Sequence, residues 1–207
     1  MNVQEPKIVG LFPTPLYLSN INRSLTETEI NFVDKCKNNS VKNDGNTTSS
    51  DSYILNNVEL KEIKKSLEIA VQDYFNQVLS STDSFFPYIT QSWINYTETN
   101  QYHHRHIHTH SLVSGVFYIK CHDELDRIEF YKNKEDRFFN LQVKEFNTFN
   151  ATDLWFPVKT GDIVLFPSTL THGVDSRERI NTRISLAFNV FVKGTIGRKD
   201  KFSELIL

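Results

Sequence analysis

The chain has 207 residues, of which 39% are hydrophobic and 23% are charged, and its formal net charge is −2. This length supports one domain with a substantial core, while the near-neutral charge argues against nucleic acid as a partner. The sequence contains no apolar run of the roughly 18 residues that a membrane helix needs, and its first residues lack the basic and then apolar pattern of a signal peptide. We therefore expect a cytoplasmic protein without a membrane partner.

The N-terminal part predicts an interrupted strand and a first helix. Residues 8–18 form a strand candidate broken by two prolines, which favours the edge of a sheet. Ser24 begins a helix signal, and Glu27 three residues later completes a capping box. Residues 38–52 are rich in Asn, Ser and Thr, so we expect a mobile loop there.

A second and longer helix is predicted from about Asn57 to Ser80, because apolar side chains recur there at intervals of three and four residues. We expect this apolar stripe to pack on one face of a sheet as part of the core. Its members are Val58, Leu60, Ile63, Leu67, Ile69, Ala70, Tyr74, Val78 and Leu79.

From about Tyr88 onward the pattern favours short strands separated by turns, which is typical of a sandwich or barrel. The strand candidates are 92–96, 114–120, 127–131, 162–166, 169–174 and 183–192. We therefore predict an α+β, mostly β fold dominated by a jelly roll. Residues 1–207 are expected to form a single domain, with residues 1–87 as helical support and residues 88–195 as the β core.

Residues 132–159 form an irregular connection that is rich in aromatic side chains. A loop of this length inside a compact domain usually has a function. We therefore expect it to cover the functional site. Its aromatic residues are Phe138, Phe139, Phe146, Phe149, Trp155 and Phe156.

A run of ten residues, 101–110, contains five of the seven histidines of the chain. If the run is extended, His104, His106, His108 and His110 line one face, because side chains two apart point the same way. Neutral imidazoles suit Fe, Zn, Cu and Ni. A polar cluster that leads into the apolar stretch 112–120 is poorly explained by packing, so we interpret it as a metal centre. Strand parity alone permits the ligand pairs 104/106, 106/108 and 108/110.

Further polar residues follow in a fixed order. The stretch 161–168, Gly-Asp-Ile-Val-Leu-Phe-Pro-Ser, leads within four residues to His172. Arg183 lies eleven residues beyond His172, and Ser185 follows it on the same strand face. A guanidinium and a hydroxyl so placed are suited to binding a carboxylate, the guanidinium with two parallel hydrogen bonds.

This ordered set resembles the Fe(II)- and 2-oxoglutarate-dependent oxygenases, and among them the phage and bacterial oxygenases allied to prolyl 4-hydroxylases. That family carries His-x-His or His-x-Asp, then Ser-Gly and an aromatic pair, Gly-Asp-x-Val-x-Phe, a distal His and Arg-x-Ser. The match covers roughly residues 92–192, and Leu-Phe-Pro-Thr-Pro near the N-terminus is also typical of the group. The resemblance implies a double-stranded β-helix that holds iron between its two sheets.

The resemblance selects His106 and His108 as ligands, because Ser114 and Gly115 follow His108 after five residues, and it makes His172 the third ligand. His108 stands where the family usually has a carboxylate. Three neutral imidazoles would leave the metal with its full charge.

For the cosubstrate, the resemblance implies that Arg183 binds the far carboxylate of 2-oxoglutarate. Ser185 and Tyr118 would assist, and Tyr96, ten residues before the first ligand, would face the cosubstrate. Arg183 and the three histidines would then be the catalytic residues. Dioxygen would be the second cosubstrate, and ascorbate is expected to stimulate the reaction.

The function implied is an oxygenase, expected to be a hydroxylase of a peptidyl, prolyl-like or small-molecule substrate. It would couple oxidative decarboxylation of 2-oxoglutarate to succinate with substrate oxidation. Two alternatives stay open, a cupin-type metalloenzyme without 2-oxoglutarate and a non-catalytic jelly-roll binding module. Arg183 and Ser185 favour the oxygenase, because a cupin needs no cation at that spacing. The sequence also leaves a homodimer open.

Some residues carry a structural and a functional interpretation. Asp175 is expected to be a turn residue, with an extra metal ligand as the alternative. Trp93 is expected to pack in the core and not to contact substrate. Arg177 and Arg179 are expected to form a solvated hairpin end, with contact to an anionic substrate as the alternative.

Overall fold

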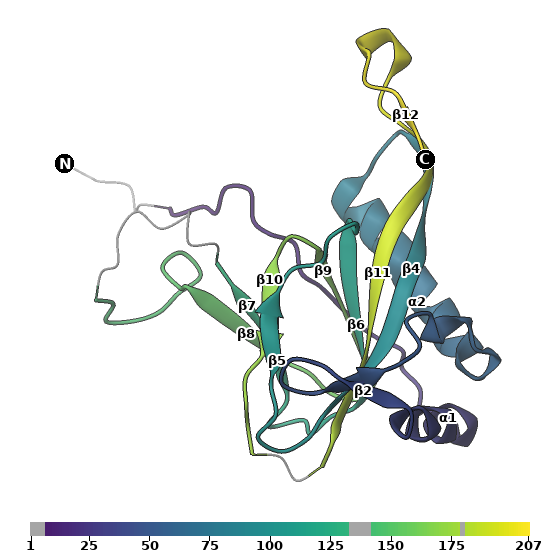
Figure 1. The fold of residues 1–207 in the computed structure, drawn as a ribbon. Coiled ribbons are helices and arrows are strands. Elements are labelled where there is room, and N and C mark those ends of the chain that lie inside the picture. Colours follow the sequence, from purple (N-terminus) through teal and green to yellow (C-terminus); the bar gives the residue numbers. More distant parts are fainter. Residues whose placement is uncertain (1–6, 133–141, 179–180) are drawn as a thin grey trace.

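The computed structural model describes residues 7–132, 142–178 and 181–207, which fold into two antiparallel sheets and two helices (Figure 1). The large sheet has the spatial order β1 (Tyr17–Asn20), β9 (Asp162–Pro167), β6 (Val113–Lys120), β11 (Arg183–Ile196), β4 (Ser84–Thr97), β3 (Thr47–Ser49), β2 (Ser40–Lys42), and β12 (Leu205–Ile206) pairs with β11. The small sheet has the order β5 (His103–His106), β10 (Thr171–Val174), β7 (Arg127–Tyr131), β8 (Asp153–Pro157). The predicted mostly β fold is confirmed.

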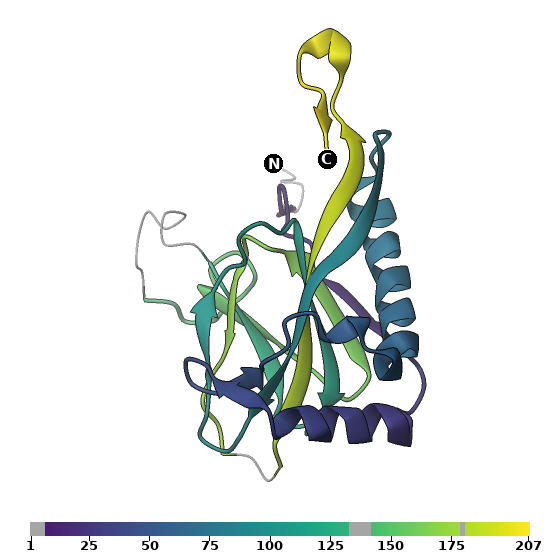
Figure 2. The ribbon, with the colours of Figure 1, turned by 45° about the vertical axis from the view of Figure 1, so that its right-hand side comes forward.

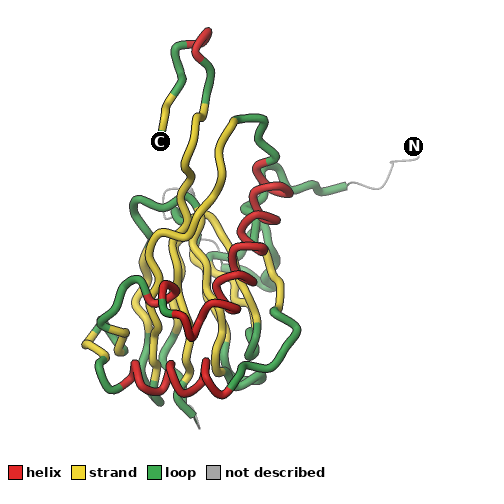
Figure 3. Tube along the Cα trace, turned by 90° about the vertical axis from the view of Figure 1, so that its right-hand side faces the viewer, coloured by secondary structure: helices red, strands yellow, loops and turns green. Residues whose placement is uncertain are grey.

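The helices cover the face of the large sheet that is turned away from the small sheet (Figure 2). They are α1 (Glu27–Lys37) and α2 (Lys61–Tyr74), with short 3-10 turns at Ile54–Asn56, Val58–Leu60 and Lys199–Lys201 and a π-helical turn at Phe75–Leu79. The view onto the helix-covered side shows α2 running obliquely across the strands and α1 below it (Figure 3). Within the described residues, no helix combines the length and the apolar character required to cross a bilayer.

Because the large sheet is covered on both faces, its central strands bury residues of both parities. On β6, Phe117 and Ile119 join the core against the helices, whereas Val116 and Tyr118 join a second core between the two sheets. This explains why the strand is apolar along its length instead of alternating between apolar and polar. The site described below lies on the face turned toward the small sheet.

The long helix is confirmed in its position but is narrower in its buried face than the sequence predicts. Its buried residues are Ile63, Leu67, Ala70, Val71 and Tyr74. Val58, Ile69, Val78 and Leu79 are exposed. The last two belong to the π-helical turn, where the changed periodicity moves side chains off the stripe.

The N-terminal strand is confirmed as an edge strand, but it is shorter than predicted. Only β1 pairs, with β9, and residues 8–15 with their prolines form no strand. The first helix begins later than predicted. Its N-cap is Thr26, whose hydroxyl accepts a hydrogen bond from the backbone N–H of Glu29, and the predicted box of Ser24 and Glu27 is not formed.

The expectation of a mobile loop at residues 38–52 is wrong, because this segment forms the hairpin β2–β3 and extends the large sheet beyond β4. Asp44 and Gly45 make its turn, Gly45 has a positive φ of 88°, and the N–H of Asn43 donates to the carbonyl of Asn46. Asp-Gly between short polar strands is a known hairpin signal. The polar composition of residues 38–52 favoured a loop over this hairpin signal.

The cap of the first helix gives a test of stability against pH. Glu29 is 2% exposed and accepts hydrogen bonds from both guanidinium nitrogens of Arg23 and from the N–H of Thr26. Burial alone raises the pKa of Glu29, but these hydrogen bonds outweigh burial and hold the pKa below its usual value. A depressed carboxyl pKa stabilises the fold above the unfolded pKa and loses that effect as the pH falls through the folded pKa.

Glu29→Gln is therefore expected to lower the free energy of unfolding by about 1–3 kcal/mol at neutral pH, and the deficit should shrink in acid. Urea denaturation over a pH series measures both effects. Glu27→Gln is the matched control, because Glu27 is exposed in the same turn and should change stability little. An equal loss in the two variants would contradict this account of the cap.

Candidate active site

Three histidines from the small sheet converge on one point. His106 lies on β5 and pairs in register with His172 on β10, and His108 follows β5 by two residues. The backbone N–H of His108 donates to the carbonyl of Ser168, which holds this segment against the end of β9. The candidate ligand atoms of His106, His108 and His172 all lie within 4.8 Å of one another. The structure thus brings together the three histidines that the sequence analysis selected.

The ring orientation of these histidines is fixed by hydrogen bonds at Nδ1. The Nδ1–H of His106 donates to the carbonyl of His104 at 2.8 Å, and that of His172 donates to the carbonyl of Leu170 at 3.0 Å. A carbonyl can only accept, so the proton sits on Nδ1 and each Nε2 keeps its lone pair. The Nε2 atoms of His106 and His108 are 3.1 Å apart. Such outer partners are typical of metal-binding imidazoles.

Burial keeps the three imidazoles neutral. Burial, with a smaller contribution from neighbouring histidines, lowers the pKa of His106 to about 4 and that of His172 to about 3. The pKa of His108 is also lowered by burial. Neutral imidazole is the form that binds a metal ion, so the triad is ready to coordinate one at neutral pH.

A bulge in β5 breaks the predicted alternation of the histidine run. His172 pairs with His106 and Val174 pairs with His103, so His104 and Arg105 together oppose Gly173. Residues 101–110 therefore do not form one extended strand, which was the condition for a shared face of the four even-numbered histidines.

The bulge changes which histidines reach the cavity. His103, and not His104, lines the inner cavity beside His106, while His104 approaches the carboxylate of Asp44 at 3.8 Å. His110 is exposed, with a positive φ of 56°. The ligand pairs 104/106 and 108/110 therefore do not face a common cavity with His172.

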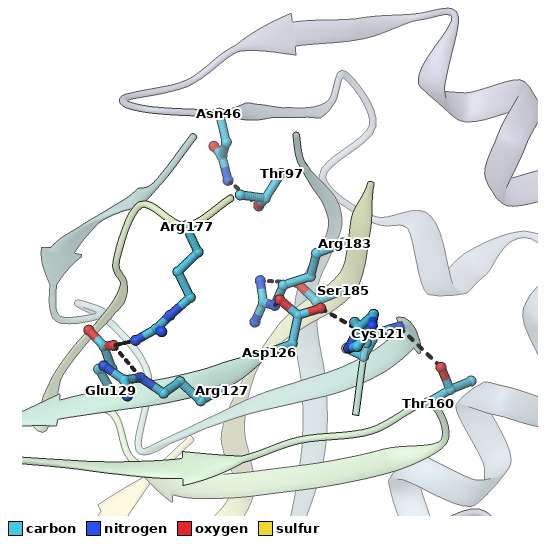
Figure 4. Close-up of polar contacts among 11 residues, drawn as sticks. Asn46, Thr97, Cys121, Asp126, Arg127, Glu129, Thr160, Arg177, Arg183 and Ser185 are labelled. Carbon is cyan, nitrogen blue, oxygen red and sulfur yellow. Dashed lines mark hydrogen bonds and ion pairs between the residues drawn. The ribbon is translucent and has the colours of Figure 1, made fainter. Parts of the chain in front are cut away.

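At the other end of the site, Arg183 is buried with a charge that is only partly compensated. Its side chain is 2% exposed, and its Nε lies 3.9 Å from Oδ1 of Asp126, which is too long for a hydrogen bond (Figure 4). One Nη donates to the hydroxyl of Ser185 at 3.5 Å. The guanidinium lies 5.2 Å from the ring centroid of Tyr118. Nε has no hydrogen-bond acceptor among the described residues.

Register places the partners of Arg183 on the same face. Ser185 pairs with Tyr118 on β6 and with Asn95 on β4, so the three side chains stand in one row across the large sheet. The hydroxyl of Tyr118 and Oδ1 of Asn95 are buried without a hydrogen-bond partner among the described residues. Burial raises the pKa of the Tyr118 phenol, so it stays protonated and can donate. Buried polar atoms left unpaired in this way indicate a site for a ligand.

One cavity connects the histidines to Arg183. The three histidines and Arg183 line it, together with apolar side chains from β6, β7, β9 and β11: Val116, Ile128, Phe166 and Ala187. A second, open groove of about 430 Å³ adjoins it and shares His106 and His108. The site therefore has a sheltered interior and an access from the hairpin side.

The expectation that Tyr96 faces the cosubstrate is wrong. Tyr96 is fully buried in the core beneath the helices, and its hydroxyl donates to the carbonyl of Val33 at 2.7 Å. Side chains alternate along β4, so Asn95 and Trp93 face the cavity instead. The expectation for Tyr96 used only its spacing of ten residues from His106. The alternation of side chains along β4 selects Asn95 instead.

Trp93 has a closer relation to the site than predicted, because it stacks on His108 with ring centroids 5.6 Å apart. Asp175 accepts a hydrogen bond from the hydroxyl of Tyr131, and Arg177 donates to Glu129, so both belong to a polar network on β7. Asp175 belongs to neither of the histidine groups that could hold an ion in the described chain. Arg179 lies outside the described residues.

The predicted cover over the site is not found in the described part of the 132–159 connection. Residues 133–141, which include Phe138 and Phe139, lie outside the described residues. β8 pairs with β7, at the edge of the small sheet opposite β5. Phe146, Phe149 and Trp155 are exposed, and none of them lines the two cavities.

Comparison with known proteins finds an oxygenase family model that matches the β core of the chain. Residues 91–189 match the profile of the family described as "Putative 2OG-Fe(II) oxygenase". This range contains both histidine segments, Arg183 and Ser185. A search of curated proteins finds no match.

Similar folds occur among solved structures, all at low sequence identity. HygX from Streptomyces hygroscopicus, solved with nickel, 2-oxoglutarate and hygromycin B, has a TM-score of 0.56 and 12% identity, covering 86% of this chain and 82% of HygX. A Pseudomonas putida prolyl-4-hydroxylase has a TM-score of 0.55 and 10% identity, with 85% and 92% covered. A Trichoplax adhaerens prolyl hydroxylase, solved with a peptide fragment of hypoxia inducible factor, has a TM-score of 0.57 and 12% identity, with 85% and 83% covered. These likenesses establish the jelly-roll fold.

The geometry of the triad predicts a loss of metal binding on substitution. His172→Ala is expected to abolish binding of Co(II), and with it metal-dependent turnover, because two imidazoles cannot complete the facial set of three. The d–d absorption of Co(II) reports binding directly. His110→Ala is the matched control and should bind Co(II) like the wild type. Retention of Co(II) by His172→Ala, or its loss in His110→Ala, would contradict the assignment of the triad.

Proposed function

Because residues 91–189 belong to the 2OG-Fe(II) oxygenase family, we propose that the protein is a 2-oxoglutarate-dependent hydroxylase in which His106, His108 and His172 hold Fe(II) and Arg183 binds the cosubstrate. The family makes it an oxidoreductase that uses Fe(II), 2-oxoglutarate and dioxygen. The assignment of residues and the type of oxidation are the proposal. One observation carries it. Three Nε2 lone pairs and a buried, incompletely paired guanidinium open into the same cavity.

The residues fit the metal and the cosubstrate in their chemistry. Three neutral imidazoles are suitable ligands for Fe(II), and they leave other coordination positions open. Arg183 matches a carboxylate in charge and planar geometry. Tyr118 and Ser185 add hydroxyl donors in the same row, so a carboxylate there would be held by up to three donor groups.

Each part of the cavity has a task in the proposed reaction. When bound, Fe(II) would let dioxygen, the oxidant, oxidise 2-oxoglutarate to succinate and carbon dioxide with one oxygen atom and the prime substrate with the other. Arg183 and Tyr118 orient the keto acid from its far end, so that its reactive end lies toward the histidines. The apolar walls, among them Val116 and Phe166, exclude water, which protects a reactive site from side reactions.

The imidazole of His108 changes the charge of the centre. A carboxylate in its place would lower the charge of the metal ion by one, whereas three neutral imidazoles leave it at its full value. A dianionic cosubstrate is attracted more strongly to such a centre. We therefore expect cosubstrate binding to depend on the metal more than on Arg183 alone.

The open groove supports a route for the prime substrate. It leads to His106 and His108 and is lined by uncharged polar side chains, with Trp93 and Ile107 as apolar members: Asn43, Thr48, Ser49, Ser52, Gln91, Thr109 and Asn189. Such a lining suits either a peptide backbone or a polar small molecule. Action in the cytoplasm is a prediction from sequence.

The proposal is tested by mixing the purified protein with Fe(II), ascorbate and 2-oxoglutarate and measuring succinate. Slow succinate formation is expected even without the prime substrate, and it should stop when Fe(II) is chelated. Binding of Co(II) without any binding of 2-oxoglutarate would favour a cupin-type enzyme. Failure to bind any divalent metal would favour a binding module.

Arg183→Ala is expected to raise the 2-oxoglutarate concentration required for half-maximal succinate formation by about tenfold or more, because a charged hydrogen-bonding group is lost. Tyr118→Phe removes one donor and should have a smaller effect in the same direction. Arg183→Lys keeps a positive charge beside Asp126 and controls for misfolding, which circular dichroism checks. Unchanged cosubstrate kinetics in a folded Arg183→Ala protein would remove Arg183 from the proposed pocket.

A further inference from the structure

We propose that Asn189 is a positioning residue that fixes the tautomer of His108 and so aims its Nε2 at the metal. Nδ1 of His108 lies 2.5 Å from Oδ1 of Asn189, and Asn189 is 6% exposed. The backbone carbonyls that hold His106 and His172 cannot be removed by substitution, whereas this acceptor is a side chain. The inference rests on the proposed function in one respect, that His108 is a metal ligand.

The amide of Asn189 makes a second hydrogen bond, to the amide of Gln91. Its Nδ2 donates to Oε1 of Gln91 at 3.3 Å, while its Oδ1 lies toward His108. An amide oxygen only accepts, so Nδ1 of His108 must carry the proton and Nε2 is left free. The reversed amide would offer a donor to Nδ1 and would move the imidazole proton to Nε2, where it would prevent coordination.

The position of Asn189 depends on a bulge in β4. Phe188 pairs with Ser92 and Val190 pairs with Ile89, so Thr90 and Gln91 together oppose Asn189. Both residues of the bulge contact Asn189, since Thr90 donates from its hydroxyl to the backbone carbonyl at 3.2 Å. Bulges commonly redirect side chains beside active sites. Here the bulge brings the side chain of Gln91 to the amide.

Trp93 restrains the same imidazole from its face. Its ring stacks on His108 at an interplanar angle of 22°. The stacking limits tilting of the imidazole, but it does not distinguish Nδ1 from Nε2. Selection of the nitrogen therefore falls to Asn189, and neither restraint adds charge to the centre.

The first test needs no variant and no metal. Two-dimensional ¹H–¹⁵N correlation of the histidine side chains in the metal-free protein reports which ring nitrogen carries the proton. We expect His108 to be protonated at Nδ1 and unprotonated at Nε2. An Nε2-protonated His108, or an even mixture of the two tautomers, would overturn the inference.

The second test measures Co(II) affinity in variants. Asn189→Leu keeps the size of the side chain but removes the acceptor, and it should weaken Co(II) binding by about 10–100-fold, the usual cost of losing an outer partner of a ligand. Asn189→Asp restores an acceptor and should bind Co(II) at least as tightly as the wild type. Thr90→Val is the matched control, because it alters the same bulge without touching the acceptor, and it should leave affinity unchanged.

The outcomes separate this inference from the proposed function, because neither test requires 2-oxoglutarate or turnover. If the wild type binds Co(II) and Asn189→Leu binds it equally well, the inference fails while the metal centre stands. If Thr90→Val loses as much affinity as Asn189→Leu, the effect comes from the bulge and the inference also fails. If Asn189→Leu does not fold, the inference is still tested by the Co(II) affinity of Asn189→Asp and by the tautomer of His108 in the wild type.

Discussion

The pairing of β11 with β6 and β4 at the centre of the large sheet is the constraint on which the site depends. One face of β11 carries Leu186, Phe188 and Val190 into the core beneath the helices. Burial of that face fixes the register, because a slip of one residue would turn these side chains toward the small sheet. The direction of the side chains on the opposite face of β11 is then fixed as well. Arg183 and Asn189 must point into the space between the sheets, one at each end of the site.

The site combines an incompletely compensated positive charge with neutral ligands. Arg183 is buried beside Asp126 at a distance that gives attraction without a hydrogen bond, so the guanidinium keeps the capacity to bind a second carboxylate. Burying a charge in this way costs free energy unless a partner completes it. The two carboxylates of a dianionic keto acid would place negative charge beside Arg183 and beside a doubly charged metal ion at the same time. Binding of such a ligand would offset that cost, which favours a site built for that type of ligand.

The sequence predicted most of the chemistry and less of the geometry. The resemblance to the oxygenase family identified the three histidines and Tyr118, and strand spacing placed Arg183 and Ser185 on one face. Tyr96 was placed wrongly because a distance along the chain was used where strand parity decides, and the buried contact of its hydroxyl with Val33 shows which face it occupies. The hairpin at residues 40–49 was missed because polar composition was given more weight than its Asp-Gly turn.

What the sequence could not reveal are the points where strand parity is interrupted. The bulge in β5 brings His103 to the same side as His106, and the bulge in β4 sets two residues against Asn189. Each depends on how many residues the neighbouring strand contributes, which is a property of the pair and not of either strand. These two bulges flank the histidine end of the cavity, and a third, at Ile119 on β6 between the partners of Ile184 and Ser185, lies at the Arg183 end. Irregular pairing therefore occurs at both ends of the site, which is why the pattern of single strands located the site but not the contacts that orient its side chains.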